Sequence, residues 1–153
     1  MPDSNIEILK KKTYIKAIEN SVGSKIFNSI FVRFKDSGEE KDILDDGDAS
    51  CAYFVSGILA IFQLMDRPHA TVGTVQKLLA ENKEWKIVDV NEIEAGDVIF
   101  WKKITYENGD SNAHAGFALS DLEAVSTDYR TRMVFKHLIS NQAVDVVYRK
   151  MNW

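Results

Sequence analysis

The chain has 153 residues, the size of one domain, and is 45% hydrophobic and 27% charged. We therefore expect one domain over residues 1–153, with a core of its own. The net charge is −4, so the chain lacks the basic surface typical of nucleic-acid-binding proteins, and no nucleic-acid partner is expected. Its one cysteine excludes an intrachain disulfide.

The N-terminus and the apolar segments bear on targeting. Residues 1–6 lack a basic stretch followed by an apolar one, so no signal peptide is predicted. The longest strongly apolar stretch, residues 52–65, is too short for a membrane span. The chain is therefore expected to be cytoplasmic or a processed, exported fragment. No sequence feature indicates an oligomeric state.

The N-terminal half has the apolar spacing of helices. This spacing predicts helices over residues 5–21, 49–65 and 71–82, the last with Thr71 near its start. The first helix rests on an apolar series at roughly helical spacing: Ile6, Leu9, Thr13, Ala17 and Val22. Alternation within residues 26–34 predicts a strand. Residues 36–48 are acidic and contain glycine, which indicates a loop or a loose hairpin.

The C-terminal half is rich in β-forming residues. We predict strands over residues 85–88, 98–101, 114–119, 123–127, 132–135 and 144–149, with a polar loop at 105–113. Because helices precede strands along the chain, the expected class is α+β, with helices packed on one side of an antiparallel sheet.

Cys51 is the first residue that can carry chemistry. Asp48 and Ser50 are both plausible N-caps, which puts Cys51 in the first turn of an apolar helix. Backbone N–H groups there have no intrahelical partner, and the helix dipole favours negative charge. The pattern therefore predicts a thiol with a lowered pKa and a nucleophilic sulfur. The alternative is a buried cysteine that acts as a small apolar residue.

A thiol nucleophile needs a base, and the chain has three histidines. His114 follows a polar loop and begins a predicted strand of small residues, where a sheet can present an imidazole to a helix start. His69 follows Pro68 in a predicted surface turn and is expected to be solvated there, and His137 lies near a strand end, where a surface histidine is the better interpretation. His114 is therefore the best candidate base.

No cofactor and no metal site are predicted. The chain has no Cys-x-x-Cys, no His-Glu-x-x-His and no phosphate-binding glycine loop. An acidic group precedes Cys51: Asp42, Asp45, Asp46 and Asp48. It lacks the sixth-position glycine and final glutamate of an EF-hand loop, so we interpret it as a solvated loop.

Three segments, in order, resemble the NlpC-type cell-wall peptidases and the related CHAP amidases, which are papain-like cysteine hydrolases. They are Ser50-Cys51-Ala52-Tyr53-Phe54-Val55, Glu94-Ala95-Gly96-Asp97-Val98-Ile99-Phe100-Trp101 and His114-Ala115-Gly116-Phe117-Ala118-Leu119. The resemblance covers roughly residues 45–127. The chain departs from the family where an aspartate usually precedes the cysteine and Ser-Gly follows it, since Ser50, Ala52 and Tyr53 stand there. Residues 1–44 lie outside the resemblance and are expected to complete the domain.

The resemblance implies a papain-like fold, with Cys51 at a helix N-terminus as nucleophile and His114 as base. The family usually orients the imidazole with a polar residue on the next strand, where Ser126 aligns. Asp128, two residues further on, and His137 are the other candidates.

The resemblance also implies a peptide or peptidoglycan-fragment substrate. The expected oxyanion donor is the Cys51 backbone N–H, with Ser50 or Tyr53 as a second donor or as part of the pocket. Trp101, Tyr106 and Tyr53 are candidate groove residues. Two alternatives stay open: an inactive binding domain on the same fold, and a cysteine hydrolase acting on a different peptide or on an acyl group.

Overall fold

The computed structural model describes residues 5–105, 107, 109 and 111–153. Within them, the chain forms three α-helices: α1 (Lys10–Asn20), α2 (Cys51–Ile61) and α3 (Val72–Glu81). Their strands are β1 (Phe31–Arg33), β2 (Glu40–Asp42), β3 (Trp85–Val88), β4 (Val98–Thr105), β5 (Ser111–Ala118), β6 (Glu123–Asp128), β7 (Met133–Leu138) and β8 (Val144–Lys150). Two 3₁₀ turns, η1 (Val90–Glu92) and η2 (Ile139–Asn141), complete the elements. The predicted α+β class is confirmed.

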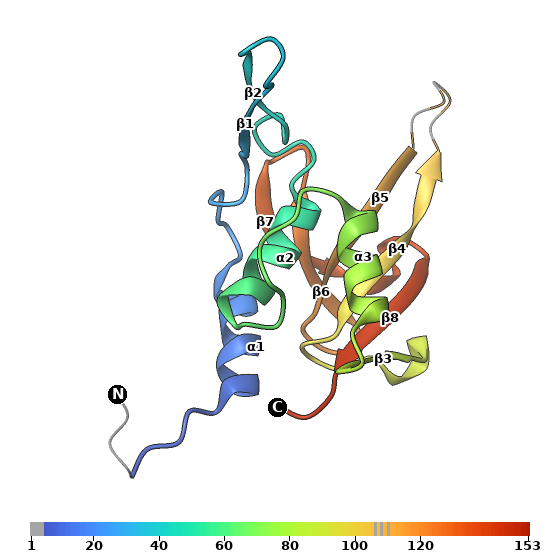
Figure 1. Cartoon of the computed structure of the whole chain (residues 1–153). Coiled ribbons are helices and arrows are strands. Elements are labelled where there is room, and N and C mark those ends of the chain that lie inside the picture. The colour runs from blue at the N-terminus through green and yellow to red at the C-terminus, as the bar shows by residue number, and fades with distance from the viewer. Residues whose placement is uncertain (1–4, 106, 108, 110) are drawn as a thin grey trace.

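The main sheet has six strands in the order β3-β8-β4-β5-β6-β7, and every pair is antiparallel (Figure 1). Strands β4 and β5 are longer than predicted and pair as far as Thr105 and Ser111, which shortens the predicted polar loop. The predicted loop residues Asn108 and Asp110 lie outside the described residues.

The three helices pack over one face of the sheet (Figure 1). The main core there combines α2 and α3 with inward side chains of the strands, including Phe100, Phe117 and Val125. A smaller apolar cluster lies on the opposite face and includes Ile99 and Trp101. Because strand side chains alternate between faces, β3, β4, β5, β6 and β8 contribute to both clusters, whereas β7 contributes Val134 to the main core. None of the described helices is long and apolar enough to cross a membrane.

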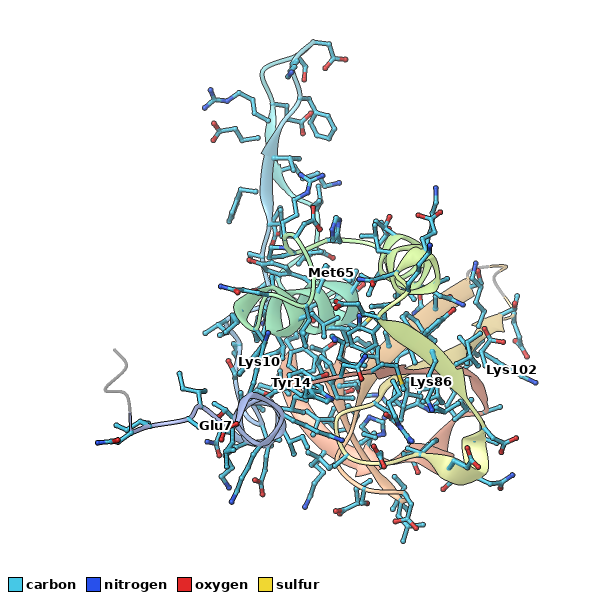
Figure 2. The ribbon with its side chains drawn as sticks, turned by 60° about the horizontal axis from the view of Figure 1, so that its bottom comes forward. Glu7, Lys10, Tyr14, Met65, Lys86 and Lys102 are labelled. Carbon is cyan, nitrogen blue, oxygen red and sulfur yellow. The ribbon has the colours of Figure 1, made fainter. Side chains whose placement is uncertain are left out.

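Helix α1 begins five residues later than predicted and buries a different face. Ile6 and Leu9 precede or flank the helix and are exposed, whereas Tyr14 and Ile18 are fully buried. Figure 2 shows Tyr14 directed into the packed interior. Its ring contacts Phe117 of the sheet edge-on, with centroids 5.9 Å apart. The apolar face predicted from Ile6, Leu9, Thr13, Ala17 and Val22 was wrong, because α1 packs on the core through Tyr14 and Ile18 instead.

The segment between α1 and α2 forms a hairpin rather than a long strand. Strands β1 and β2 pair with Val32 opposite Lys41, and Figure 2 shows this hairpin standing away from the body of the molecule. Ile26 and Phe31 are each 76% exposed. The predicted strand over residues 26–34 is therefore reduced to three residues, while the hairpin predicted as an alternative for 36–48 is present.

The helices around the site end and begin at identifiable signals. Helix α2 stops after Ile61, and Gln63 then takes a positive φ of 57°. Helix α3 begins where predicted, because the Thr71 hydroxyl accepts a hydrogen bond from the Thr74 N–H at 3.3 Å.

The Gly96-Asp97 turn joins several elements of the sheet. Asp97 is 1% exposed and accepts hydrogen bonds from Nε and Nη2 of Arg149 on β8, each at 2.8 Å. The Tyr14 hydroxyl donates to the Gly96 carbonyl at 2.9 Å, and the Ala118 N–H donates to the Asp97 carbonyl at 2.9 Å. Gly96 has a φ of 95°, a conformation that other residues rarely adopt. This turn ties α1, β4, β5 and β8 together.

Replacing Asp97 with Asn is expected to lower the free energy of unfolding by about 2–4 kcal/mol, because the substitution leaves the Arg149 guanidinium without its bidentate partner. Urea denaturation of wild type and variant measures this change. Asp121→Asn, at an exposed position, is the matched control and should leave the urea midpoint unchanged. Equal midpoints for Asp97→Asn and Asp121→Asn would contradict a structural role for the turn.

Candidate functional site

A cleft of about 510 Å³ opens where the start of α2, the start of α3 and the outer parts of β4 and β5 meet. Both Cys51 and His114 line it. Its other lining residues are mostly small or polar: Asp48, Ala49, Ser50, Ala52, Ala70, Thr71, Val72, Gly73, Gln76, Lys103, Asn112, Ala113, Thr127 and Tyr129. The structure therefore brings the two predicted reactive side chains to one concave surface.

The segment before α2 fixes where Cys51 lies. Residues 45–47 have consecutive positive φ angles of 51°, 51° and 95°. Nη1 of Arg132 donates to the first two carbonyl oxygens of this segment, the second at 3.0 Å. A Cβ on Gly47 would lie 2.7 Å from Cγ of Asn28, and Asn28 also donates to the Arg132 carbonyl at 2.7 Å. Side chains distant in sequence thus hold the approach to the helix.

The Asp42 side chain stabilises the chain that leads to α2. The Asp42 carboxylate accepts backbone hydrogen bonds from Ile30 at 2.9 Å, from Leu44 at 3.0 Å and from Asp46 at 2.9 Å. Although desolvation raises its pKa, these hydrogen bonds dominate and lower the pKa of Asp42 to about 2. Within the described residues, no group of three or more acidic, histidine or cysteine side chains is placed to hold a metal ion.

Cys51 is the first residue of α2 and is 9% exposed. Its Sγ lies 3.9 Å from the carbonyl oxygen of Ala113, the residue before His114. Burial raises the pKa of the Cys51 thiol, whereas the backbone N–H groups of Ala115, Ala52 and Cys51 itself act to lower it. The sequence predicted a lowered pKa; that was wrong, because desolvation outweighs the donors at the helix start.

The ring of His114 is held by Ser126. Its Nε2 lies 2.9 Å from Ser126 Oγ. Ser126 is fully buried and pairs in register with Gly116, so the two side chains are diagonal neighbours on one face of the sheet. A Cβ on Gly116 would lie 2.6 Å from the Val125 carbonyl oxygen. The glycine therefore permits the close strand approach that brings serine and imidazole together.

A second imidazole lies behind the serine. His137 Nε2 is 2.7 Å from Ser126 Oγ, and His137 Nδ1 is 3.0 Å from the Leu138 carbonyl oxygen. Of the three candidates for orienting His114, Ser126 makes the direct contact and His137 contacts Ser126. In the described residues no hydrogen bond joins Cys51 to His114, and Nδ1 of His114 has no hydrogen-bond partner.

Trp101 supports the two imidazoles rather than lining the cleft. It pairs with His114 across β4 and β5, and its ring centroid lies 5.3 Å from that of His114 and 5.5 Å from that of His137. It is 3% exposed, and its Nε1 donates to the Ile139 carbonyl at 3.0 Å. This position differs from the predicted one in the groove.

The other predicted site residues have varied positions. Asp128 ends β6 and accepts a hydrogen bond from the Thr131 N–H at 3.1 Å, so it shapes a turn and does not hydrogen-bond His114. Ser50 is buried at the cleft, and its hydroxyl donates to the Gly47 carbonyl at 3.3 Å. Tyr53 packs edge-on against Phe27 away from the cleft lining. Tyr106 lies outside the described residues.

The environment of His114 keeps its ring neutral near pH 7. Burial, and to a smaller extent the neighbouring His137, lower the pKa of His114 to about 4, although Asp128 acts to raise it. Burial also lowers the pKa of His137, against the opposing effects of the Leu138 carbonyl and Asp128. Both rings are therefore uncharged at neutral pH, and His114 is able to accept a proton.

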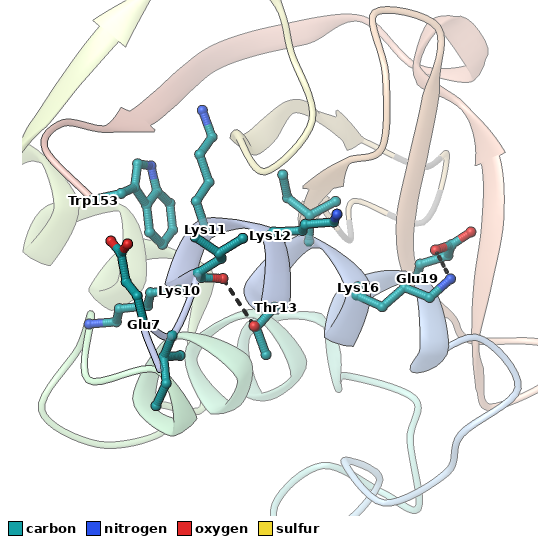
Figure 3. Close-up of a pocket in the computed structure, with 11 residues that line it drawn as sticks. Glu7, Lys10, Lys11, Lys12, Thr13, Lys16, Glu19 and Trp153 are labelled. Carbon is teal, nitrogen blue, oxygen red and sulfur yellow. Dashed lines mark hydrogen bonds and ion pairs between the residues drawn. The ribbon is translucent and has the colours of Figure 1, made fainter. Parts of the chain in front are cut away.

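A larger hollow lies elsewhere, along α1 and the C-terminal Trp153. It has a volume of about 1040 Å³, and Figure 3 shows Lys10, Lys11, Lys12 and Lys16 of α1 among the residues that line it. Two of these lysines have partners: Lys16 lies 2.6 Å from Glu19, and Lys11 lies 3.3 Å from Glu94. Among the described residues that line this groove there is no histidine or cysteine, so the predicted nucleophile and base lie in the smaller cleft instead.

No model of a known protein family matches the chain, and no curated protein matches it in sequence.

Acidification should destabilise the protein through His114. The unfolded chain binds a proton at His114 near pH 6.5, whereas the folded chain does so only near pH 4. The unfolded state therefore holds more protons between these values, and stability falls as the pH drops from about 6.5 to about 4, by up to about 3 kcal/mol. Urea denaturation across this range, in wild type and in His114→Gln, isolates the contribution. Parallel stability curves for the two proteins would contradict the lowered pKa.

Proposed function

We propose that this protein is a cysteine hydrolase of papain-like fold that cleaves an amide or peptide bond. In this proposal Cys51 is the nucleophile, His114 the general base and Ser126 the residue that orients the imidazole. The observation that carries it is the shared cleft: Cys51 and His114 both line it, and Nε2 of His114 is fixed by Ser126 at 2.9 Å. A nucleophile, a base and an orienting group on one concave surface are the minimum set for acyl transfer.

The proposed reaction begins from a neutral pair. Because burial raises the pKa of Cys51 and lowers that of His114, the resting groups are a thiol and an uncharged imidazole. Nδ1 of His114 takes the thiol proton as the sulfur attacks the carbonyl carbon. The imidazolium then gives that proton to the leaving amine, and a thioester forms on Cys51. Water, deprotonated by the same nitrogen, releases the acid and restores the thiol.

Backbone donors at the helix start suit the oxyanion of this reaction. The N–H groups of Cys51 and Ala52 act on the sulfur, and the first helical hydrogen bond in this turn is donated by Phe54. These donors are fixed before substrate arrives, so they need no rearrangement as negative charge develops on the carbonyl oxygen.

The cleft lining favours a peptide over a lipid acyl chain. Its side chains are mostly small or polar, and Lys103 and Asp48 contribute one charge of each sign. Such a surface offers hydrogen-bond partners to amide and charged groups, and Val72 is the one branched aliphatic side chain among the lining residues that the structure describes. The resemblance to NlpC-type peptidases makes peptidoglycan stem peptides the first substrates to test, and other peptides the second.

A catalytically inactive binding domain is the second candidate. Cys51 is 9% exposed, and within the described residues its thiol donates a hydrogen bond to the Ala113 carbonyl rather than to His114. Catalysis therefore requires that substrate binding bring sulfur and imidazole into contact, as catalytic hydrogen bonds often tighten only in the substrate complex.

Replacing Cys51 with Ala should abolish hydrolysis. We expect the rate on peptidoglycan fragments, or on the best peptide of a mixed panel, to fall at least about 10³-fold, since removing a nucleophile in such enzymes costs up to about 10⁶-fold. Release of new amino groups, followed by mass spectrometry of the products, measures the rate.

Ile61→Ala is the matched control, because Ile61 lies on the same helix and is 66% exposed. It should hydrolyse at the wild-type rate. Equal hydrolysis by wild type and Cys51→Ala would overturn the assignment of the nucleophile. Binding of a fragment without hydrolysis by wild type would favour the binding domain.

A further inference from the structure

His137 is a half-buried titratable group that the proposed reaction does not use. It lies on β7, and its Nε2 is 2.7 Å from Ser126 Oγ, which is in turn 2.9 Å from Nε2 of His114. Its Nδ1 is 3.0 Å from the Leu138 carbonyl oxygen. Four polar groups therefore form one continuous hydrogen-bonded chain that ends at the candidate base.

The direction of this chain follows from what each group can do. A carbonyl oxygen only accepts hydrogen bonds, so His137 must carry a hydrogen on Nδ1. In the neutral ring, Nε2 of His137 is then an acceptor and takes the hydroxyl hydrogen of Ser126. The serine oxygen is left to accept, so Nε2 of His114 donates to it. Nδ1 of His114 therefore keeps a free lone pair, the form required of a base toward Cys51.

We propose that His137 is a positioning residue that sets the tautomer of His114 through Ser126, and that protonation of His137 switches His114 out of its base form. This inference rests on the proposed cysteine hydrolase function. Its regulatory meaning is that the site is active when His137 is neutral and inactive when it is charged.

Protonation reverses the chain without breaking it. One proton enters from solvent at Nδ1 of His114, the hydrogen on Nε2 of His114 passes to the Ser126 oxygen, and the serine hydrogen passes to Nε2 of His137. One proton has been added, and the positive charge resides on His137. His114 is again neutral, but its hydrogen is now on Nδ1, so it has no lone pair for the Cys51 thiol.

The surroundings of His137 favour the uncharged form of its ring. The titratable groups that act on it are His114 from β5 and Asp128 from β6. On its own strand, Phe135 stacks on its ring at 4.6 Å, and Lys136 is paired with Glu123 at 3.4 Å. Burial outweighs the groups that favour charge and lowers the pKa of His137. The base form of His114 is therefore the resting form at neutral pH.

Two substitutions separate the acceptor role of His137 from its charge. In His137→Gln, the amide oxygen takes the place of Nε2 and still accepts from Ser126, but the residue no longer titrates. In His137→Phe, the ring shape remains while the acceptor is lost. His69→Gln is the matched control, because the His69 side chain pairs with Asp66 at 3.1 Å and takes no part in the chain.

Long-range ¹H–¹⁵N correlation spectra show directly which ring nitrogen of His114 carries the hydrogen, without any substrate. At pH 7.5 the wild type, His137→Gln and His69→Gln should have it on Nε2, and His137→Phe should have a mixture. On acidification the hydrogen should move to Nδ1 in wild type but not in His137→Gln. An His114 tautomer that is the same in all four proteins at every pH would overturn the inference.

The second readout is the pH profile of Cys51 alkylation by iodoacetamide and of hydrolysis. We expect His137→Phe to be at least about tenfold slower than wild type at pH 7.5, since general-base catalysis is worth about 10²–10⁴-fold. His137→Gln should retain most of the rate, with its acid limb moved to lower pH. An unmoved acid limb would count against the switch. If the His114 tautomers respond as expected while the wild type hydrolyses no substrate, the role of His137 in setting the tautomer is supported and the proposed hydrolase function is contradicted.

Discussion

Helix α2 is buried along eight of its eleven residues, and it packs against β5 and β6. In this packing the Cys51 sulfur lies beside the backbone of Ala113 and Ala115. His114 lies between those two residues in the chain, so the contact that buries the helix also brings the two candidate reactive groups to the same cleft. The site therefore follows from core packing together with the segment before α2, which Arg132 holds in place.

The same packing determines the charge state of the site. Desolvation opposes the thiolate on Cys51 and the imidazolium on His114, so both groups rest uncharged. A preformed ion pair would require the opposite shifts. We therefore infer that activation depends on proton transfer during the reaction, and that the orientation of the His114 ring, held by Ser126, matters more than a resting charge on sulfur.

Much of the fold could be predicted from the sequence, because local signals and tertiary structure agree over long stretches. The apolar run of α2 and the Thr71 cap of α3 lie where their patterns indicate, although α2 spans Cys51–Ile61 rather than the predicted residues 49–65. Helix α1 was placed on the wrong face, since its burial depends on the contact of Tyr14 with a strand some hundred residues away in sequence. No local pattern contains such a contact.

The candidate site could be predicted only in part, because local signals identify some of its residues and pairing across the sheet determines the others. Helix-start and strand-start positions identified Cys51 and His114, and the structure places both at the cleft. The link from His114 through Ser126 to His137 depends on the registers of β5 with β6 and of β6 with β7. Register is set by pairing across the sheet, so sequence alone left three candidates for this role. Trp101 has the signature of a groove aromatic, yet it packs beneath the imidazoles.

The proposed mechanism requires that Cys51 form an acyl-enzyme with the help of His114. Intact-mass analysis after brief exposure to an activated ester such as p-nitrophenyl acetate tests this without knowledge of the natural substrate. The proposed mechanism predicts that one acetyl group is added, that peptide mapping locates it on Cys51, and that acetylation is fast in wild type and slow in His114→Gln. An unmodified Cys51 in folded wild-type protein, or equal rates in the two proteins, would contradict it.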